Sequence, residues 1–183
     1  MNLKMTTASG RQVDPLNLTE DDITIEDIAH HLARINRFNG ATKRPISVAQ
    51  HSVYVRRLLE LSHKEVALQA LLHDATEAYL SDMIRPLKVQ EIFSFYREIE
   101  DRAHEVIAHK FGFPAEMYPE VSAADDLMVR FEAFKGFNIW PEALMLPPPD
   151  RAERKAVGPW APWGWKVSEE VFLIEYSMIM RMT

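Results

Sequence analysis

The sequence contains 183 residues, a length that a single compact domain accounts for, and we predict one domain over residues 1–183. The 21 Lys and Arg residues against 27 Asp and Glu give a net charge of −6, which disfavours a nucleic-acid partner. With no cysteine, no signal-peptide pattern and no run of apolar residues that could span a membrane, we expect a cytoplasmic protein without disulfides or a membrane partner.

Apolar residues recur at spacings of three and four along most of the chain, and the 6 glycines are few, so we predict an all-α fold. The polar residues 1–22 are expected to form an irregular N-terminal arm. Thr24 is typical of a helix N-cap, and the apolar stripe behind it predicts a first helix that stops at Asn39 and Gly40.

Two further capping patterns predict the next helices. Ser47 with Gln50 begins a helix that places His51 on its inward face. Ser62 with Glu65 begins a third helix, in which polar residues occupy positions where apolar ones are expected. These polar residues are His73, Asp74 and Glu77. Because Pro86 breaks a helix, we expect a loop or a sharp bend over residues 81–88.

Two long helices follow, over residues 89–111 and 120–135, with Gly112 ending the first of them. On the second, Asp125 shares an inward stripe with four apolar residues, whereas Asp126 is rotated about 100° away. The members of that stripe are Val121, Ala124, Met128 and Phe131.

All 4 tryptophans of the sequence lie between Trp140 and Trp165, within a proline-rich stretch that we predict to be an irregular collar over residues 136–167. Ser168 is then expected to cap a last helix that runs through Met180. The collar could pack over the core, cover a pocket or form a subunit interface, and we favour packing.

Histidine and aspartate on inward helix faces are costly to bury without partners, and one shared divalent cation would satisfy several of them. His51, His73, Asp74 and Asp125 are the candidates. Two nitrogen and two oxygen ligands suit Mn, Fe, Co, Ni, Zn or Mg. The alternative is that each histidine instead hydrogen-bonds a backbone carbonyl or a nearby acid.

The segments around these residues read Ala49-Gln50-His51-Ser52, then Leu71-Leu72-His73-Asp74-Ala75-Thr76-Glu77, then Ala123-Ala124-Asp125. Their order H…HD…D resembles the HD-domain phosphohydrolases, with family-like sequence from about Ile25 to Glu132. Within that family the chain is most similar to small bacterial 5′-deoxynucleotidases and to phage dATP triphosphohydrolases. The resemblance implies an all-α HD-domain bundle, one catalytic metal and hydrolysis of a nucleotide phosphoester. It also implies a homo-oligomer in a bacterium or a phage-infected bacterial host.

The resemblance also assigns roles around the metal. Glu77 would lie next to the metal-bound water and orient or deprotonate it, while Asp82 matches a second acid near the substrate. The residues that would meet the nucleotide or its phosphates are Arg37, Phe38, Arg85 and Lys88. Simpler alternatives exist for each of these residues. Glu77 could form a surface ion pair, Asp82 could form a turn, Arg85 and Lys88 could be solvated on the surface, and Arg37 could contact the dipole at a helix C-terminus.

These features predict a phosphohydrolase that acts on deoxynucleotides. The phage-like resemblance favours a dNTP substrate, cleaved to nucleoside and tripolyphosphate. So do the basic residues Arg37, Arg85 and Lys88, which could hold the extra phosphate charge. A 5′-deoxynucleotidase acting on dNMPs is the alternative. An alternative of another class is a non-catalytic regulatory module that binds a metal and a nucleotide.

Overall fold

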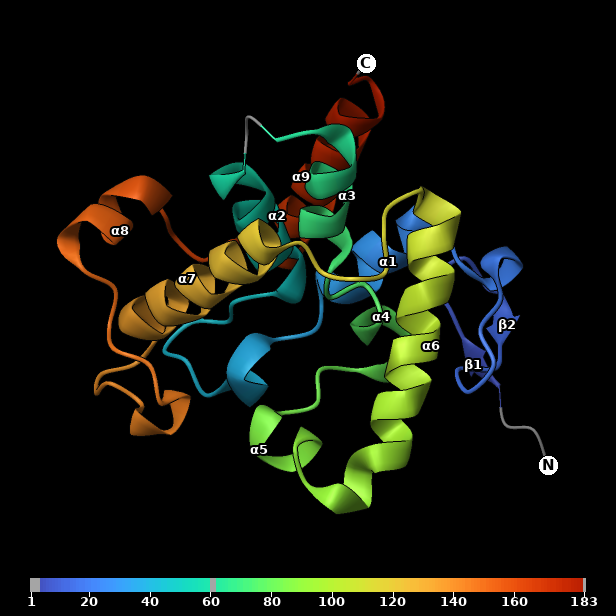
Figure 1. Cartoon of the computed structure of the whole chain (residues 1–183), viewed down its shortest axis with the longest axis horizontal. Coiled ribbons are helices and arrows are strands. Elements are labelled where there is room, and N and C mark those ends of the chain that lie inside the picture. Colours follow the sequence, from blue (N-terminus) through green and yellow to red (C-terminus); the bar gives the residue numbers. More distant parts are fainter. Residues whose placement is uncertain (1–3, 60–61, 183) are drawn as a thin grey trace.

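The computed structural model describes residues 4–59 and 62–182, and it confirms the predicted all-α class (Figure 1). The described part contains one small antiparallel sheet, β1 with β2. No helix within it is both long enough and apolar enough to cross a membrane. The strands are β1 (Met5–Thr6) and β2 (Gln12–Val13), and the helices are α1 (Ile25–Leu32), α2 (Val48–Leu58), α3 (Lys64–Leu72), α4 (Glu77–Leu80), α5 (Arg85–Lys88), α6 (Ser94–Phe111), α7 (Pro119–Gly136), α8 (Arg151–Val157) and α9 (Trp165–Met180).

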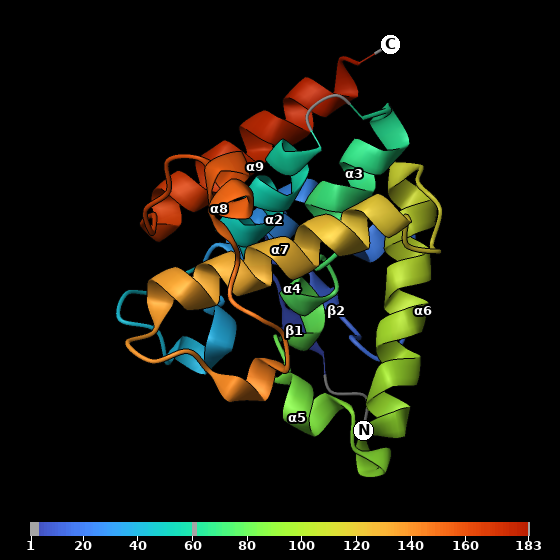
Figure 2. The same ribbon diagram turned by 60° about the vertical axis from the view of Figure 1, so that its left-hand side comes forward.

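Helix α2 is the centre of the bundle and packs against α1, α3, α7, α8 and α9. Figure 2 shows α7 crossing in front of α2 and α3, while α6 stands along one edge of the molecule. Buried apolar side chains from α2, α3 and α7 form a cluster of their own. Its buried members are Tyr54, Val55, Val66, Ala70, Val121, Ala124, Met128 and Phe131. This cluster fixes how the three helices lie relative to one another.

The strongest helix-end signals are confirmed. The Thr24 hydroxyl accepts a hydrogen bond from the backbone N–H of Asp27, and the Ser47 hydroxyl accepts one from Gln50, each at 3.1 Å. Gly112 ends α6 with a φ of 78°, a left-handed conformation that glycine adopts without strain.

The first helix is shorter in the structure than the sequence predicted, and the N-terminal arm is more regular than predicted. Helix α1 ends at Leu32, and a separate 3-10 turn spans Arg37–Gly40, because the backbone here pairs with residues 46 and 47 instead of continuing the helix. The arm contains the β1–β2 hairpin, and it is held to α1 by Ser9, whose backbone N–H and hydroxyl both donate to the Asp27 carboxylate.

The structure also corrects the boundaries of three later elements. His63, not Ser62, precedes α3, and the predicted loop over residues 81–88 contains the short helix α5. The helix predicted from residue 89 begins instead at Ser94, after a 3-10 turn over Glu91–Phe93.

The collar predicted over residues 136–167 is partly helical. Helix α8 starts with a reciprocal capping box between Asp150 and Glu153, and both Glu153 carboxylate oxygens also accept hydrogen bonds from Arg130 of α7. Helix α9 begins at Trp165 with Gly164 as its N-cap, so Ser168 is not the cap but lies in the first turn. The four-residue spacing lets the Ser168 hydroxyl bond the Gly164 carbonyl.

One part of the collar, residues 157–163, packs over the core, as favoured from the sequence. The Trp163 ring lies 5.3 Å from that of Tyr54, and Trp160 meets Phe131 edge to face at 5.9 Å. Gln50 of α2 anchors the segment, because its amide donates to the Ala161 carbonyl and accepts from the Trp163 backbone N–H. The residue next to His51 therefore fixes the collar.

Gln69 of α3 anchors the connection between α6 and α7, as Gln50 anchors the collar. Its buried amide donates to the carbonyls of Pro114 and Glu116 and accepts from the backbone N–H of Tyr118.

Replacing Gln69 by leucine is expected to lower the free energy of unfolding by about 2–4 kcal/mol, since these backbone groups lose their partner. Urea denaturation measures the change. Gln90→Leu, the same substitution at an exposed position, is the control, and equal losses in both variants would contradict the prediction.

Candidate metal centre

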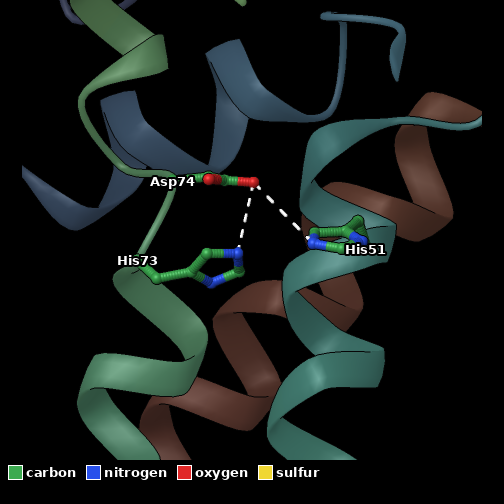
Figure 3. A group of neighbouring side chains, drawn as sticks. All are labelled: His51, His73 and Asp74. Carbon is green, nitrogen blue, oxygen red and sulfur yellow. Dashed lines mark ion pairs between the residues drawn. The ribbon is translucent and has the colours of Figure 1, made fainter. Parts of the chain in front are cut away.

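The four predicted ligands meet where α2, α7 and the end of α3 come together. Oδ2 of Asp74 lies 3.3 Å from Nε2 of His73 and 3.8 Å from Nε2 of His51 (Figure 3). From α7, Oδ1 of Asp125 approaches the same two nitrogens, at 2.9 Å from His51 and 3.9 Å from His73. The ligand atoms of His51, His73 and Asp74 all lie within 4.8 Å of one another, so this group could hold a metal ion.

These separations fit ligands of one ion. At metal–ligand distances of about 2.1 Å, neighbouring ligand atoms lie roughly 3.0–3.4 Å apart and opposite ones roughly 4.2 Å apart. The four nitrogen–oxygen separations, from 2.9 to 3.9 Å, fall in or near this range. Both imidazoles are buried, whereas the side chains of Asp74 and Asp125 are 21% and 31% exposed. Solvent can therefore approach the cluster from the carboxylate side.

Both histidines turn their Nε2 atom toward the cluster. Nδ1 of His73 lies 2.9 Å from the carbonyl of Ala70, which can only accept, so this nitrogen carries the proton. Nδ1 of His51 lies 3.2 Å from both carboxylate oxygens of Glu132. Within the described chain, neither Nε2 has a partner in hydrogen-bond geometry, although each is buried. Two buried Nε2 atoms that face two carboxylates are the observation that a shared cation explains.

The position of His73 and Asp74 corrects the sequence prediction that both lie inside one helix. Helix α3 ends at Leu72, with His73 as its C-cap, and the chain turns before α4 begins at Glu77. At this break the His73 side chain bonds the carbonyl of Ala70 in the last turn of α3. Adjacent side chains diverge on a continuous helix, but this turn lets Asp74 fold back toward His73 (Figure 3).

The cluster concentrates negative charge that requires a positive partner. Burial lowers the pKa of His51, but Glu132 and Asp125 outweigh it and raise that pKa to about 9. For His73 burial again lowers the pKa, while Asp74 and Asp125 bring it above its usual value. Burial raises the pKa values of Asp74 and Asp125, yet the two histidines hold both below their usual range. Imidazolium protons or a cation would satisfy the carboxylates equally, and a cation requires both histidines to be neutral.

Glu77 and Asp82 follow the cluster in sequence, at either end of the α4 segment. Oε2 of Glu77 is buried and has no hydrogen-bond partner among the described residues. Burial raises the pKa of Glu77 well above its usual value, and the charges of Asp74 and Asp82 raise it further. Burial also raises the pKa of Asp82. Only the ionised carboxylate can accept a proton from water, and raised proton affinity makes that ionised form the stronger base, which suits Glu77 to general-base chemistry.

The predicted nucleotide contact Arg37 points into the protein interior. Its Nη1 lies 3.2 Å from Oδ2 of Asp74, and its Nε lies 2.9 Å from Oε2 of Glu132. Burial opposes the charged guanidinium, but these two carboxylates raise the pKa of Arg37. Phe38 has a φ of 55° and packs edge to face on Phe137. The structure therefore places Arg37 beside the candidate metal ligand Asp74, and Phe38 between Arg37 and Phe137.

Glu132 is a site residue that the sequence interpretation missed. It lies on α7, is fully buried and contacts both His51 and Arg37. A signal exists, because residues 125, 128 and 132 follow one another by three and four and so share one helix face. An acid on that inward stripe requires buried partners.

The other two predicted phosphate contacts lie on α5, outside the cluster. Lys88 forms an ion pair with Glu100 of α6, and Arg85 is exposed. Four of the other five histidines make contacts outside the cluster. His30 and His109 meet glutamates, His31 and His104 meet backbone carbonyls, and His63 precedes α3.

Comparison with known proteins places the chain among relatives of similar size. No protein-family model matches the sequence. The uncharacterized protein RCAP_rcc00048 of Rhodobacter capsulatus is 42% identical over an alignment of 135 positions, and the match covers 68% of this chain and 68% of that protein. The uncharacterized protein YfdR of Escherichia coli K12 is 40% identical over 126 residues, which cover 69% of this chain and 68% of YfdR.

Proposed function

The chain belongs to one family with YfdR and RCAP_rcc00048, and from the cluster it carries we propose that it is a metal-dependent phosphohydrolase acting on deoxynucleotides. The observation that carries the proposal is the pair of buried Nε2 atoms of His51 and His73, which have no hydrogen-bond partner in the described part of the chain and which face Asp74 and Asp125. The H…HD…D order of these residues, which resembles the HD-domain phosphohydrolases, supports it.

His51, His73, Asp74 and Asp125 would hold the ion, and this donor set suits Mn, Fe, Co, Ni, Zn or Mg. A divalent cation in such a site supplies a Lewis acid for the phosphoryl group and lowers the pKa of bound water. Glu77 would take the proton of the attacking water, a role supported by its buried Oε2, which has no hydrogen-bond partner among the described residues.

The bond to be cleaved joins the α-phosphorus to the 5′ oxygen of the nucleoside. The water oxygen is added to phosphorus, and a proton goes to the departing 5′ oxygen. A dNTP would yield nucleoside and tripolyphosphate, and we place this reaction first because of the phage-like resemblance and the exposed Arg85 near the site in sequence. Arg37 and Lys88 are paired with carboxylates, which favours the smaller dNMP as the second candidate.

A screen of dNMPs, dNDPs and dNTPs with Mn²⁺, Co²⁺, Ni²⁺, Zn²⁺ or Mg²⁺ tests the proposal. We expect nucleoside and tripolyphosphate from a dNTP, separated by ion chromatography, and a His73→Gln preparation controls for contaminating phosphatases. Nucleoside and inorganic phosphate from a dNMP would instead identify a 5′-deoxynucleotidase. The absence of hydrolysis with every metal would contradict catalysis and favour a metal-containing regulatory module that binds nucleotides.

A further inference from the structure

Glu132 occupies a buried position between a metal-ligand candidate and an arginine. Its side chain is fully buried, and both carboxylate oxygens lie 3.2 Å from Nδ1 of His51. Oε2 also accepts a hydrogen bond from Nε of Arg37 at 2.9 Å. The guanidinium balances the carboxylate charge, which allows Glu132 to stay ionised in the interior.

An ionised carboxylate can only accept hydrogen bonds, so Nδ1 of His51 must carry the proton. The lone pair of neutral His51 is then on Nε2, which faces Asp74 and Asp125. His73 reaches the same tautomer through the backbone carbonyl of Ala70. Of the two histidines, His51 is therefore the one whose tautomer depends on a side chain that can be substituted.

The contact with Arg37 extends the effect of Glu132 to a second ligand. While Nε of Arg37 donates to Glu132, its Nη1 donates to Oδ2 of Asp74 at 3.2 Å. This is the oxygen that approaches both imidazoles (Figure 3). A rigid planar guanidinium held at one end by Glu132 thus fixes the orientation of the Asp74 carboxylate at the other.

We propose that Glu132 is a positioning residue that sets the tautomer and ring orientation of His51 and, through Arg37, the orientation of Asp74. The inference rests on the proposed metal site but not on the identity of the substrate. Partners of this kind behind a ligating histidine contribute about 10- to 100-fold to metal affinity.

The test compares Glu132→Gln with Glu175→Gln, using Zn²⁺ titrations followed by calorimetry. Glu175 is the matched control, because it is a buried glutamate that accepts a hydrogen bond from Arg57 on the face of α2 that contacts α9. We expect Zn²⁺ affinity to fall about 10- to 100-fold in Glu132→Gln and to stay within about twofold of wild type in Glu175→Gln. Equal affinity in both variants would overturn the proposal.

A second measurement uses the wild-type protein and does not depend on the folding of a variant. In the Zn²⁺ complex, the ¹⁵N spectrum of labelled histidine should show His51 protonated at Nδ1, and protonation at Nε2 would overturn the proposal. If wild type binds Zn²⁺ but hydrolyses no nucleotide, the proposed function fails while both measurements still decide the role of Glu132. If wild type does not bind Zn²⁺, the proposed function and the proposed role of Glu132 both fail.

Discussion

The Glu77→Gln variant is expected to keep its metal and to lose about 10²- to 10⁴-fold in kcat for deoxynucleotide hydrolysis. Glutamine has the shape of glutamate but cannot accept the proton of the attacking water. The proposed ligands His51, His73, Asp74 and Asp125 remain unchanged, so metal content should stay at the wild-type level. A change confined to kcat would identify Glu77 as a proton-transfer residue.

The surroundings of Glu77 explain why this change should not disrupt the fold. Oε2 is buried without a hydrogen-bond partner among the described residues, so the neutral amide breaks no bond there. Burial and the charges of Asp74 and Asp82 already disfavour the ionised carboxylate, as its raised pKa indicates. Removing that charge should leave the stability of the protein equal to that of wild type or higher.

Steady-state hydrolysis, metal analysis by mass spectrometry and thermal unfolding check this prediction together. Glu91→Gln is the control, because it makes the same chemical change at an exposed position. Wild-type turnover in Glu77→Gln would refute the role of Glu77. Loss of metal along with turnover would instead make Glu77 a ligand.

Local sequence signals predicted the positions of His51 and Asp125 correctly. The hydroxyl of Ser47 fixes where α2 begins, and the helical period then places His51, four residues later, in the interior. The same period separates Asp125 from the exposed Asp126 on α7. Both inferences succeed because a single helix and its own periodicity determine them.

The break after α3 and the anchoring of the collar could not be predicted in this way. A helix through His73 was expected, but the His73 side chain bonds the carbonyl of Ala70, and such bonds compete with helix continuation. Gln50 was interpreted only as part of a capping pattern with Ser47, yet its amide finds two partners in the collar, 111 and 113 residues away in sequence. Tertiary partners outweigh the local pattern in the second case.

Glu132 was missed for a related reason. Its partners Arg37 and His51 lie 95 and 81 residues away along the chain. A single sequence shows an acid on an apolar stripe but not what faces it. The bundle places Arg37 and His51 against that stripe, and only then does a buried carboxylate become favourable.

The Asp125→Asn variant is expected to lose more than about 100-fold in metal affinity, and hydrolysis should fall with it. A ligand contributes more than the outer partners that support ligands, whose loss costs about 10- to 100-fold. The amide has the size of the carboxylate but lacks the charge that balances a cation. Asp125 is the one proposed ligand that comes from α7, so its loss would open the cluster on that side.

The competing explanation is that Asp125 only pairs with protonated His51, whose Nε2 lies 2.9 Å from Oδ1. In that case Asp125→Asn would lower the free energy of unfolding of the metal-free protein and leave metal affinity within a few-fold of wild type. Zn²⁺ calorimetry and unfolding measured with and without the metal separate the two explanations. Asp126→Asn is the matched control, since it removes the same charge from the next residue of α7, which is exposed. A large loss of affinity in Asp125→Asn but not in Asp126→Asn would show that the ion needs this carboxylate rather than the overall charge of the helix.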